Sequence, residues 1–242
     1  MVPSVFLLGK GFYKRGTINI RIVLEGSLKM RKKIISAQKL AILLCRMEGL
    51  EYKTVKNLTE KLLSMYAVGQ SKPVKESRQR NYQTIHEEKQ GIRRRYIEII
   101  IGKRKFTDKE YEEFILDVVT SNWFKEKADN ILDEIEKHVT RAVSDGDCGD
   151  NLTTEGKQIK KILKEAFLSG ANNIKSDDTI YTDMGISRAT FFRRRDAGVV
   201  IFGMLMWYYA KRREYEDIIA GIVDKPNDEE YMALISRPAF LY

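Results

Sequence analysis

The chain has 242 residues, of which 43% are hydrophobic, and this is enough apolar surface for a buried core in one domain or two small ones. Its two cysteines, Cys45 and Cys148, are too few and too far apart for a disulfide framework or a zinc site, which favours a reducing cytoplasm. The two histidines stand far apart and no phosphate-binding glycine motif occurs, so we expect no catalytic residues, no metal site and no cofactor.

The formal net charge of +9 is unevenly distributed. Basic residues outnumber acidic ones by 20 to 7 from Lys29 to Phe106, whereas acidic residues outnumber basic ones by 13 to 5 from Thr107 to Asp150. A basic surface attracts phosphate polyanions, which favours a nucleic acid as partner. Only four prolines occur and β-branched alternation is scarce beyond residue 29, so we predict an all-α fold, a helical bundle.

Residues 1–29 are interpreted as a doubtful leader. The apolar stretch Val5 to Leu8 is too short for the core of a signal peptide. Glu25, Gly26 and Ser27 can be encoded by a purine-rich stretch resembling a bacterial ribosome-binding site, and they lie just before Met30. We therefore expect translation to start at Met30.

Residues 30–67 are predicted to form a small N-terminal helical region. Lys33 to Gly49 has the apolar spacing of an amphipathic helix that stops at the glycine, and Thr54 to Met65 repeats the pattern. Two helices around a glycine-containing turn have two interpretations, a plain helical hairpin or a second DNA-binding hairpin. Residues 68–80, polar and basic with Gly69 and Pro73 as helix breakers, are predicted to be a linker.

Residues 81–150 are predicted to be a helical middle region, first basic and then acidic. A helix over Asn81 to Ile101 carries one basic triplet, and a second triplet follows Gly102. These six residues are candidates for phosphate contacts: Arg93, Arg94, Arg95, Lys103, Arg104 and Lys105. Thr107 and Glu110 form a capping box for the next helix, and Trp123 with Phe124 marks a corner.

Ala128 to Val143 is predicted to be a helix with an acidic face of Asp129, Asp133, Glu134 and Glu136. That face has two interpretations, a contact for RNA polymerase or a second subunit, and a solvated surface. The stretch from Asp145 to Glu155 lacks the glycine and glutamate that a calcium loop requires at its sixth and twelfth positions. We interpret it as a polar interdomain loop ending in a helix cap at Thr153 or Thr154.

Residues 151–225 are predicted to be a helix-turn-helix DNA-binding domain, followed by a C-terminal tail over 226–242. Ile180 and Met184 share one helical face, Gly185 fits the positive φ of a helix end, and Ser187 caps the next helix. Phe191 then points inward, and the apolar run from Gly198 to Trp207 is the buried continuation of this second helix. That run has about half the length of a bilayer span, so no membrane partner is expected.

The outward side of the second helix supplies the candidate DNA contacts. Candidates for base-edge contacts are Ser187, Arg188, Ala189, Thr190, Phe192 and Arg193. Arginine presents a two-donor fork to guanine in the major groove, which favours Arg188 and Arg193 for sequence readout. Further candidates for phosphate contacts are Lys175, Arg195 and Arg194, whose stem would follow the core edge with its charge outside.

The stretch Gly185-Ile-Ser-Arg-Ala-Thr-Phe-Phe-Arg-Arg-Arg-Asp-Ala197 resembles the recognition half of the sigma-factor region-four helix-turn-helix. It is most similar to the variant in phage and prophage regulators of the ArpU and RinA kind, and the resemblance covers about residues 157–206. Tyr181 stands where that motif usually has a small residue. The resemblance implies sequence-selective binding of double-stranded DNA by the six residues named for base-edge contacts.

These observations predict a non-enzymatic, cytoplasmic DNA-binding protein that regulates transcription. Two other functions fit the same pattern. A small-terminase-like subunit would recruit phage DNA through the helix-turn-helix and build a homo-oligomeric ring from its other helices. A helical interaction module would instead offer its arginine clusters to an acidic protein.

The leader hypothesis predicts that the native protein lacks residues 1–29. Mass spectrometry of protein purified from its natural source should therefore detect no peptide that precedes Met30. Detection of such peptides would contradict the hypothesis.

Overall fold

The computed structural model describes residues 35–69, 82–101, 108–144, 152–170 and 172–236. The helices in these ranges are α2 (Ala37–Met47), α3 (Tyr52–Gly69), α4 (Tyr82–Ile101), α5 (Asp108–Thr120), α6 (Asn122–His138), α7 (Glu155–Leu163), α8 (Asp177–Asp183), α9 (Arg188–Ile219) and α10 (Glu229–Ser236). A π-helical turn, Lys164–Leu168, continues α7. Strands β1 (Ala142–Ser144) and β2 (Leu152–Thr154) form an antiparallel hairpin between α6 and α7. The prediction of an all-α bundle is confirmed.

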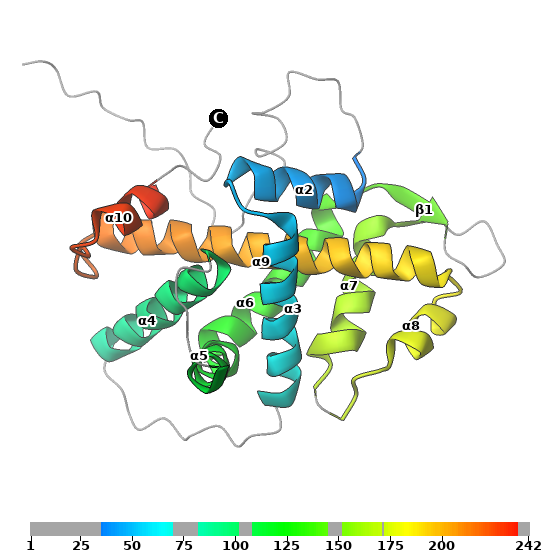
Figure 1. Cartoon of the computed structure of the whole chain (residues 1–242), viewed down its shortest axis with the longest axis horizontal. Coiled ribbons are helices and arrows are strands. Elements are labelled where there is room, and N and C mark those ends of the chain that lie inside the picture. Colours follow the sequence, from blue (N-terminus) through cyan, green and yellow to red (C-terminus); the bar gives the residue numbers. More distant parts are fainter. Residues whose placement is uncertain (1–34, 70–81, 102–107, 145–151, 171, 237–242) are drawn as a thin grey trace, which may run out of the picture.

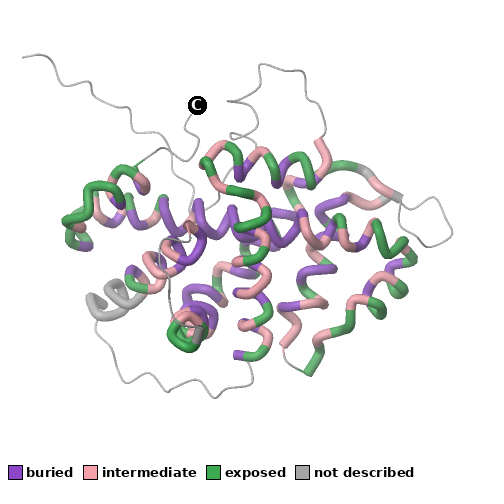
Figure 2. The backbone as a smooth tube through the Cα atoms, in the orientation of Figure 1, coloured by how far each residue is buried: buried purple, intermediate pink, exposed green. Residues whose placement is uncertain are grey.

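Helix α9 is the axis of the molecule. It has 32 residues, which corresponds to about 48 Å, and it runs along the longest dimension of the molecule (Figure 1). Helices α2, α3, α4, α6, α7, α8 and α10 pack against it. Every residue from Ala197 to Tyr208 is buried (Figure 2). The predicted burial of this apolar run is confirmed. Because the run is buried on all sides of the helix, neighbours must cover it all round, and α2, α3, α4, α6 and α7 do so.

Two glycines let neighbouring helices approach α9 closely. At Gly203, where α3 crosses, an added Cβ would lie 2.1 Å from Oγ1 of Thr59. At Gly198, where α7 crosses, an added Cβ would lie 2.5 Å from Cγ2 of Ile159. The hydroxyl of Tyr96 in α4 donates a hydrogen bond of 3.0 Å to the carbonyl of Gly203. Close contact of these side chains with the backbone of α9 therefore fixes the position of α9 relative to its neighbours.

The C-terminal half of α9 is held by buried charges. Arg93 of α4 pairs with Asp217 at 2.7 Å and with Glu214 at 3.4 Å, and all three side chains are almost fully buried. Lys211 pairs with Glu48 at 3.0 Å and lies over the ring of Trp207. Removing one partner from such a pair leaves an uncompensated charge in the interior, so these pairs lock α9 to α4 and to the end of α2.

Several predicted boundaries need correction. Helix α6 begins at Asn122, capped by Ser121, directly after α5 ends at Thr120, so the chain turns just before Trp123, which lies in the first turn of α6. It ends at His138, and residues expected to extend it form β1 instead. The predicted cap at Thr154 is confirmed, since its hydroxyl accepts from the amide of Lys157. Helix α10 lies within what was predicted as a tail.

The predicted division at residue 151 lies inside one continuous core. Buried side chains of α2, α3, α4, α5, α6, α7, α9 and α10 contribute to a single cluster, and α7 packs on both α6 and α9. Val68 and Gly69 end α3, while the other residues of the predicted linker, residues 1–29 and the capping residue Thr107 lie outside the described residues. Among the described helices, none combines the length and apolar character that crossing a bilayer requires.

The Gly203 crossing gives a stability prediction. The variant Gly203→Ala should lower the free energy of unfolding by about 1–3 kcal/mol, because the new methyl group has no space beside Thr59. The measurement is denaturant-induced unfolding followed by circular dichroism.

The matched control is Gly91→Ala in α4, where nothing lies within 4 Å of an added Cβ. It should raise the free energy of unfolding by about 0.5–1 kcal/mol, because alanine favours a helix interior. Adding Thr59→Ala to Gly203→Ala should restore part of the loss. Equal stability of the Gly203 variant and the wild type would show that α3 and α9 are not in close contact.

Candidate nucleic-acid interface

The segment α8, turn and start of α9 has the local geometry that the sequence indicates. Ser187 has extended backbone, and its hydroxyl accepts a hydrogen bond of 3.2 Å from the amide of Thr190, which confirms the predicted cap. Gly185 has φ 59°, as predicted. The amide of Ile186 donates to the carbonyl of Tyr181 at 3.2 Å, so the chain reverses direction within a few residues.

A small apolar cluster, separate from the main core, holds this segment together. Its buried members are Ile162 of α7, Ile180 of α8, Met184 of the turn and Phe191 of α9. The prediction that Phe191 points inward is therefore confirmed. Tyr181, in the position where a small residue is usual, is half-buried and its ring centroid lies 5.9 Å from that of Phe191. The larger side chain thus fits at the edge of the cluster.

The six candidates for base-edge contacts lie at the beginning of α9. Ser187, Arg188, Ala189 and Arg193 are exposed, whereas Thr190 and Phe192 are half-buried. The guanidinium of Arg188 lies 5.6 Å from the ring centroid of Phe192. Within the described part of the chain, no carboxylate pairs with Arg188 or Arg193. Both guanidinium groups are therefore available for a partner.

Arg194 needs correction as a phosphate candidate. The whole residue is only 6% exposed, and its guanidinium donates a hydrogen bond to the side-chain carbonyl of Gln158 in α7. The expectation that its charge would lie outside the core edge is therefore wrong. Its place in the helix turns it toward α7, where the guanidinium helps to join the two helices.

Two other phosphate candidates in this region have acidic partners. Arg195 lies over the ring of Phe167 and bonds Glu60 of α3 at 2.6 Å. Lys175 bonds Asp183 at 2.8 Å, and this bond raises the pKa of the lysine and lowers that of the aspartate. Because carboxylates already neutralise both cations, neither offers phosphate a free charge in this conformation.

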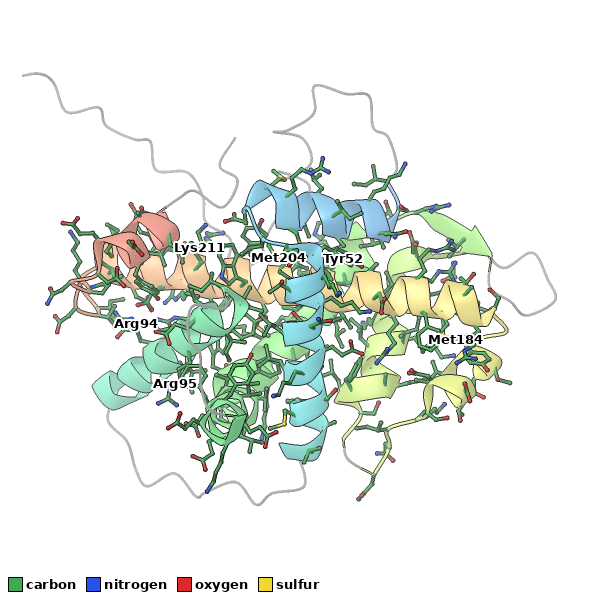
Figure 3. The ribbon with its side chains drawn as sticks, in the orientation of Figure 1. Tyr52, Arg94, Arg95, Met184, Met204 and Lys211 are labelled. Carbon is green, nitrogen blue, oxygen red and sulfur yellow. The ribbon has the colours of Figure 1, made fainter. Side chains whose placement is uncertain are left out.

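The basic triplet of α4 lies at the opposite end of the molecule from the turn. Figure 3 shows Arg94 and Arg95 at one end of the long axis and Met184 at the other. Arg93 is only 2% exposed, so its interpretation as a phosphate contact is wrong. Arg94 bonds Glu214 at 2.6 Å, and Arg95 bonds Asp117 at 2.5 Å. The second triplet, Lys103, Arg104 and Lys105, lies outside the described residues.

The predicted acidic face of α6 is partly engaged within the chain. Lys160 of α7 bonds Asp133 at 2.8 Å and Glu136 at 2.5 Å, and these bonds raise its pKa. Glu134 is buried beside His138, with 2.9 Å between the carboxylate and Nε2, so its assignment to an exposed face is wrong. Asp129 is exposed.

The partners that hold the arginines were missed by sequence reasoning. Gln158 and Glu60 lie 36 and 135 residues from the arginines they bond. No local motif links positions so far apart. The only sequence signal is the inward helical position of Arg194, which required either a buried partner or a different register.

The described residues contain no group of three or more metal-binding side chains close enough to hold an ion. Burial raises the pKa of the Cys45 thiol to about 12, so it is protonated at neutral pH. Comparisons of the chain with protein-family models, with curated proteins and with solved structures found no match.

The cap and the turn give a second stability prediction. Ser187→Ala should lower the free energy of unfolding by about 1 kcal/mol because the amide of Thr190 loses its acceptor. Gly185→Ala should also cost about 1 kcal/mol, because its φ of 59° strains a residue with a Cβ. Urea denaturation measures both changes.

The control is Ser64→Ala, an exposed serine within α3 that should be neutral or slightly stabilising. Equal effects of the Ser64 and Ser187 variants would show that the Ser187 hydroxyl does not cap α9.

Proposed function

We propose that this protein binds double-stranded DNA through α8 and the beginning of α9, acting as a helix-turn-helix, and that it regulates transcription without catalysing a reaction. The observation that carries the proposal is the pair of exposed arginines, Arg188 and Arg193, in the first two turns of α9. They lie on the outward side of a capped helix whose opposite side is anchored by Phe191.

The geometry supports a fork-like contact with base edges. Arg188 lies against the ring of Phe192, which restricts its motion and presents its donors beyond the helix surface. Arg193 is exposed five residues further along, which is about 1.4 helical turns, and Ala189 between them leaves room for close approach of a base. A helix narrow enough for the major groove can bring both side chains to neighbouring base pairs.

The arginines of α9 differ in whether they bond other side chains of the chain, and this difference indicates which of them could contact DNA. Arg194 and Arg195 hold α9 to Gln158 and Glu60, so their charges serve the fold. In the described part of the chain no carboxylate or amide side chain pairs with Arg188 or Arg193, and the guanidinium of Arg188 contacts the neighbouring ring of Phe192. Exposed arginines without an acidic partner, next to ion-paired or hydrogen-bonded ones in the same helix, favour a role outside the chain.

The proposal predicts that the protein selects a consensus from a pool of randomised duplexes. On the selected site, Arg188→Ala should weaken binding by about 1–3 kcal/mol and relax the preference at one base pair. Fluorescence anisotropy with the selected duplex and with single-base variants measures both effects.

The matched control is Arg212→Ala, which removes the same exposed charge near the other end of the same helix. It should leave affinity and preference unchanged. If no duplex is enriched, or if the Arg188 variant binds like the wild type, the proposed function is wrong. Equal loss on every sequence would instead assign Arg188 to phosphate and contradict its role in reading bases.

A further inference from the structure

The hairpin of α2 and α3 repeats the turn of α8 and α9. The C-cap residue of α2 is Glu48, with φ −98° and ψ 1°, and that of α8 is Met184, with φ −91° and ψ −6°. The next residue in each case is a glycine with positive φ, Gly49 at 68° and Gly185 at 59°. The two turns therefore correspond residue by residue, with a constant offset.

The hydrogen bonds of the two turns correspond in the same register. The amide of Gly49 donates to the carbonyl of Arg46 at 3.1 Å, and the amide of Leu50 donates to Cys45 at 2.9 Å. The equivalent bonds in the other hairpin are Gly185 to Thr182 at 3.0 Å and Ile186 to Tyr181 at 3.2 Å. Both hairpins thus reverse the chain by the same arrangement of backbone bonds.

The apolar positions correspond as well. Three positions have the same burial in both hairpins: a buried residue of the first helix, a half-buried residue of the turn and a buried residue of the second helix. The equivalent pairs are Leu44 with Ile180, Leu50 with Ile186, and Val55 with Phe191. Both second helices therefore turn the same side toward the core and the opposite side toward solvent.

The solvent side of the first hairpin is basic and polar. Lys39, Arg46 and Lys53 are exposed there, against one exposed carboxylate, Glu51. Thr54 and Asn57 add exposed polar groups on α3. Such a surface matches a phosphate backbone in charge, whereas Glu51 at the position of Ser187 disfavours close contact with base edges.

Helix α3 crosses α9 on the side that carries the proposed reading face. Phe192, on the proposed reading face, and Gly203, at the crossing with α3, are 11 residues apart, which is close to three helical turns. α3 therefore stands on the side of α9 that carries the reading face. The hairpin contacts α9 at Asp196, which pairs with Lys56, and at Lys211, which pairs with Glu48. These contacts lie about 12 and 34 Å along α9 from Arg188, within about one turn of a DNA duplex, which is about 34 Å.

We propose that the α2–α3 hairpin is a second contact for the same duplex and that it binds phosphates through Arg46 and Lys53. This inference rests on the proposed function, because the duplex is placed by α9. The hairpin adds affinity and fixes the orientation of the duplex, while base preference resides in α9.

The test uses the full chain and the duplex selected as described above. Affinity falls as salt concentration rises. In the double variant Arg46→Ala with Lys53→Ala, the magnitude of the slope of log affinity against log salt concentration should be smaller by about two, one for each lost phosphate contact. It should weaken binding equally on the consensus and on its single-base variants. The matched control, Arg212→Ala with Lys225→Ala, removes one arginine and one lysine at the other end of α9 and should leave the slope unchanged.

The outcomes separate this inference from the proposed function. If Arg188→Ala weakens binding but the slope of the Arg46 and Lys53 variant equals that of the wild type, the hairpin is not a contact and α9 still reads DNA. If the wild type binds no duplex, both proposals fail. Every substituted side chain is exposed, so all variants should have the thermal unfolding midpoint of the wild type. Equal midpoints would show that a loss of binding does not result from a loss of folding.

Discussion

Complete burial of the middle of α9 is the constraint on which the rest of the structure depends. An apolar segment from Ala197 to Tyr208 cannot face water on any side, so helices from the whole length of the chain must surround it. Gly198 and Gly203 allow two of them to approach closely. The charged residues of α9 lie in the turns before and after this segment. Some of them are buried, such as Lys211 and Asp217, and others are exposed, such as Arg188.

Position along the bundle decides what each basic side chain does. Arg93, Arg194 and Lys211 lie where helices meet, and each has a buried polar partner. Breaking such a pair typically costs about 3–5 kcal/mol, whereas an exposed pair contributes about 0–1 kcal/mol. The positive charge of the sequence therefore overstates the charge available to a polyanion. Arg188 and Arg193 are exceptions because they lie on the outward side of α9, opposite the buried Phe191.

Features encoded within a few residues could be predicted from the sequence. The Ser187 cap, the Gly185 turn and the inward Phe191 each follow from local backbone chemistry, and all three are confirmed. The burial of the apolar run of α9 could likewise be predicted from the sequence. Arg194 was misplaced because its partner, Gln158, is determined by how α7 crosses α9, which no local pattern records.

The same reason explains the errors in the middle of the chain. The helix predicted to continue to Val143 ends at His138, because Val139 leaves the helical region with φ −87° and ψ 79°. Its carbonyl then accepts from the amide of Gly156, so pairing with a later segment competes with helix extension. The existence of helix α4 was predicted correctly. The direction of the Arg93 side chain, however, depends on packing against Glu214, which lies 121 residues away in the sequence.

Continuity of α9 from its exposed first turns into the core has a consequence for the thermodynamics of recognition. The backbone of Arg188 to Arg193 is already ordered by folding, so a ligand need not compensate the roughly 1–2 kcal/mol per residue that ordering a flexible segment costs. Only rotamers of surface side chains lose freedom, at about 0.5–1.5 kcal/mol each. If DNA binds at this end of the molecule, as proposed, it docks against a helix that folding has already ordered, and binding should bring no gain in helical content.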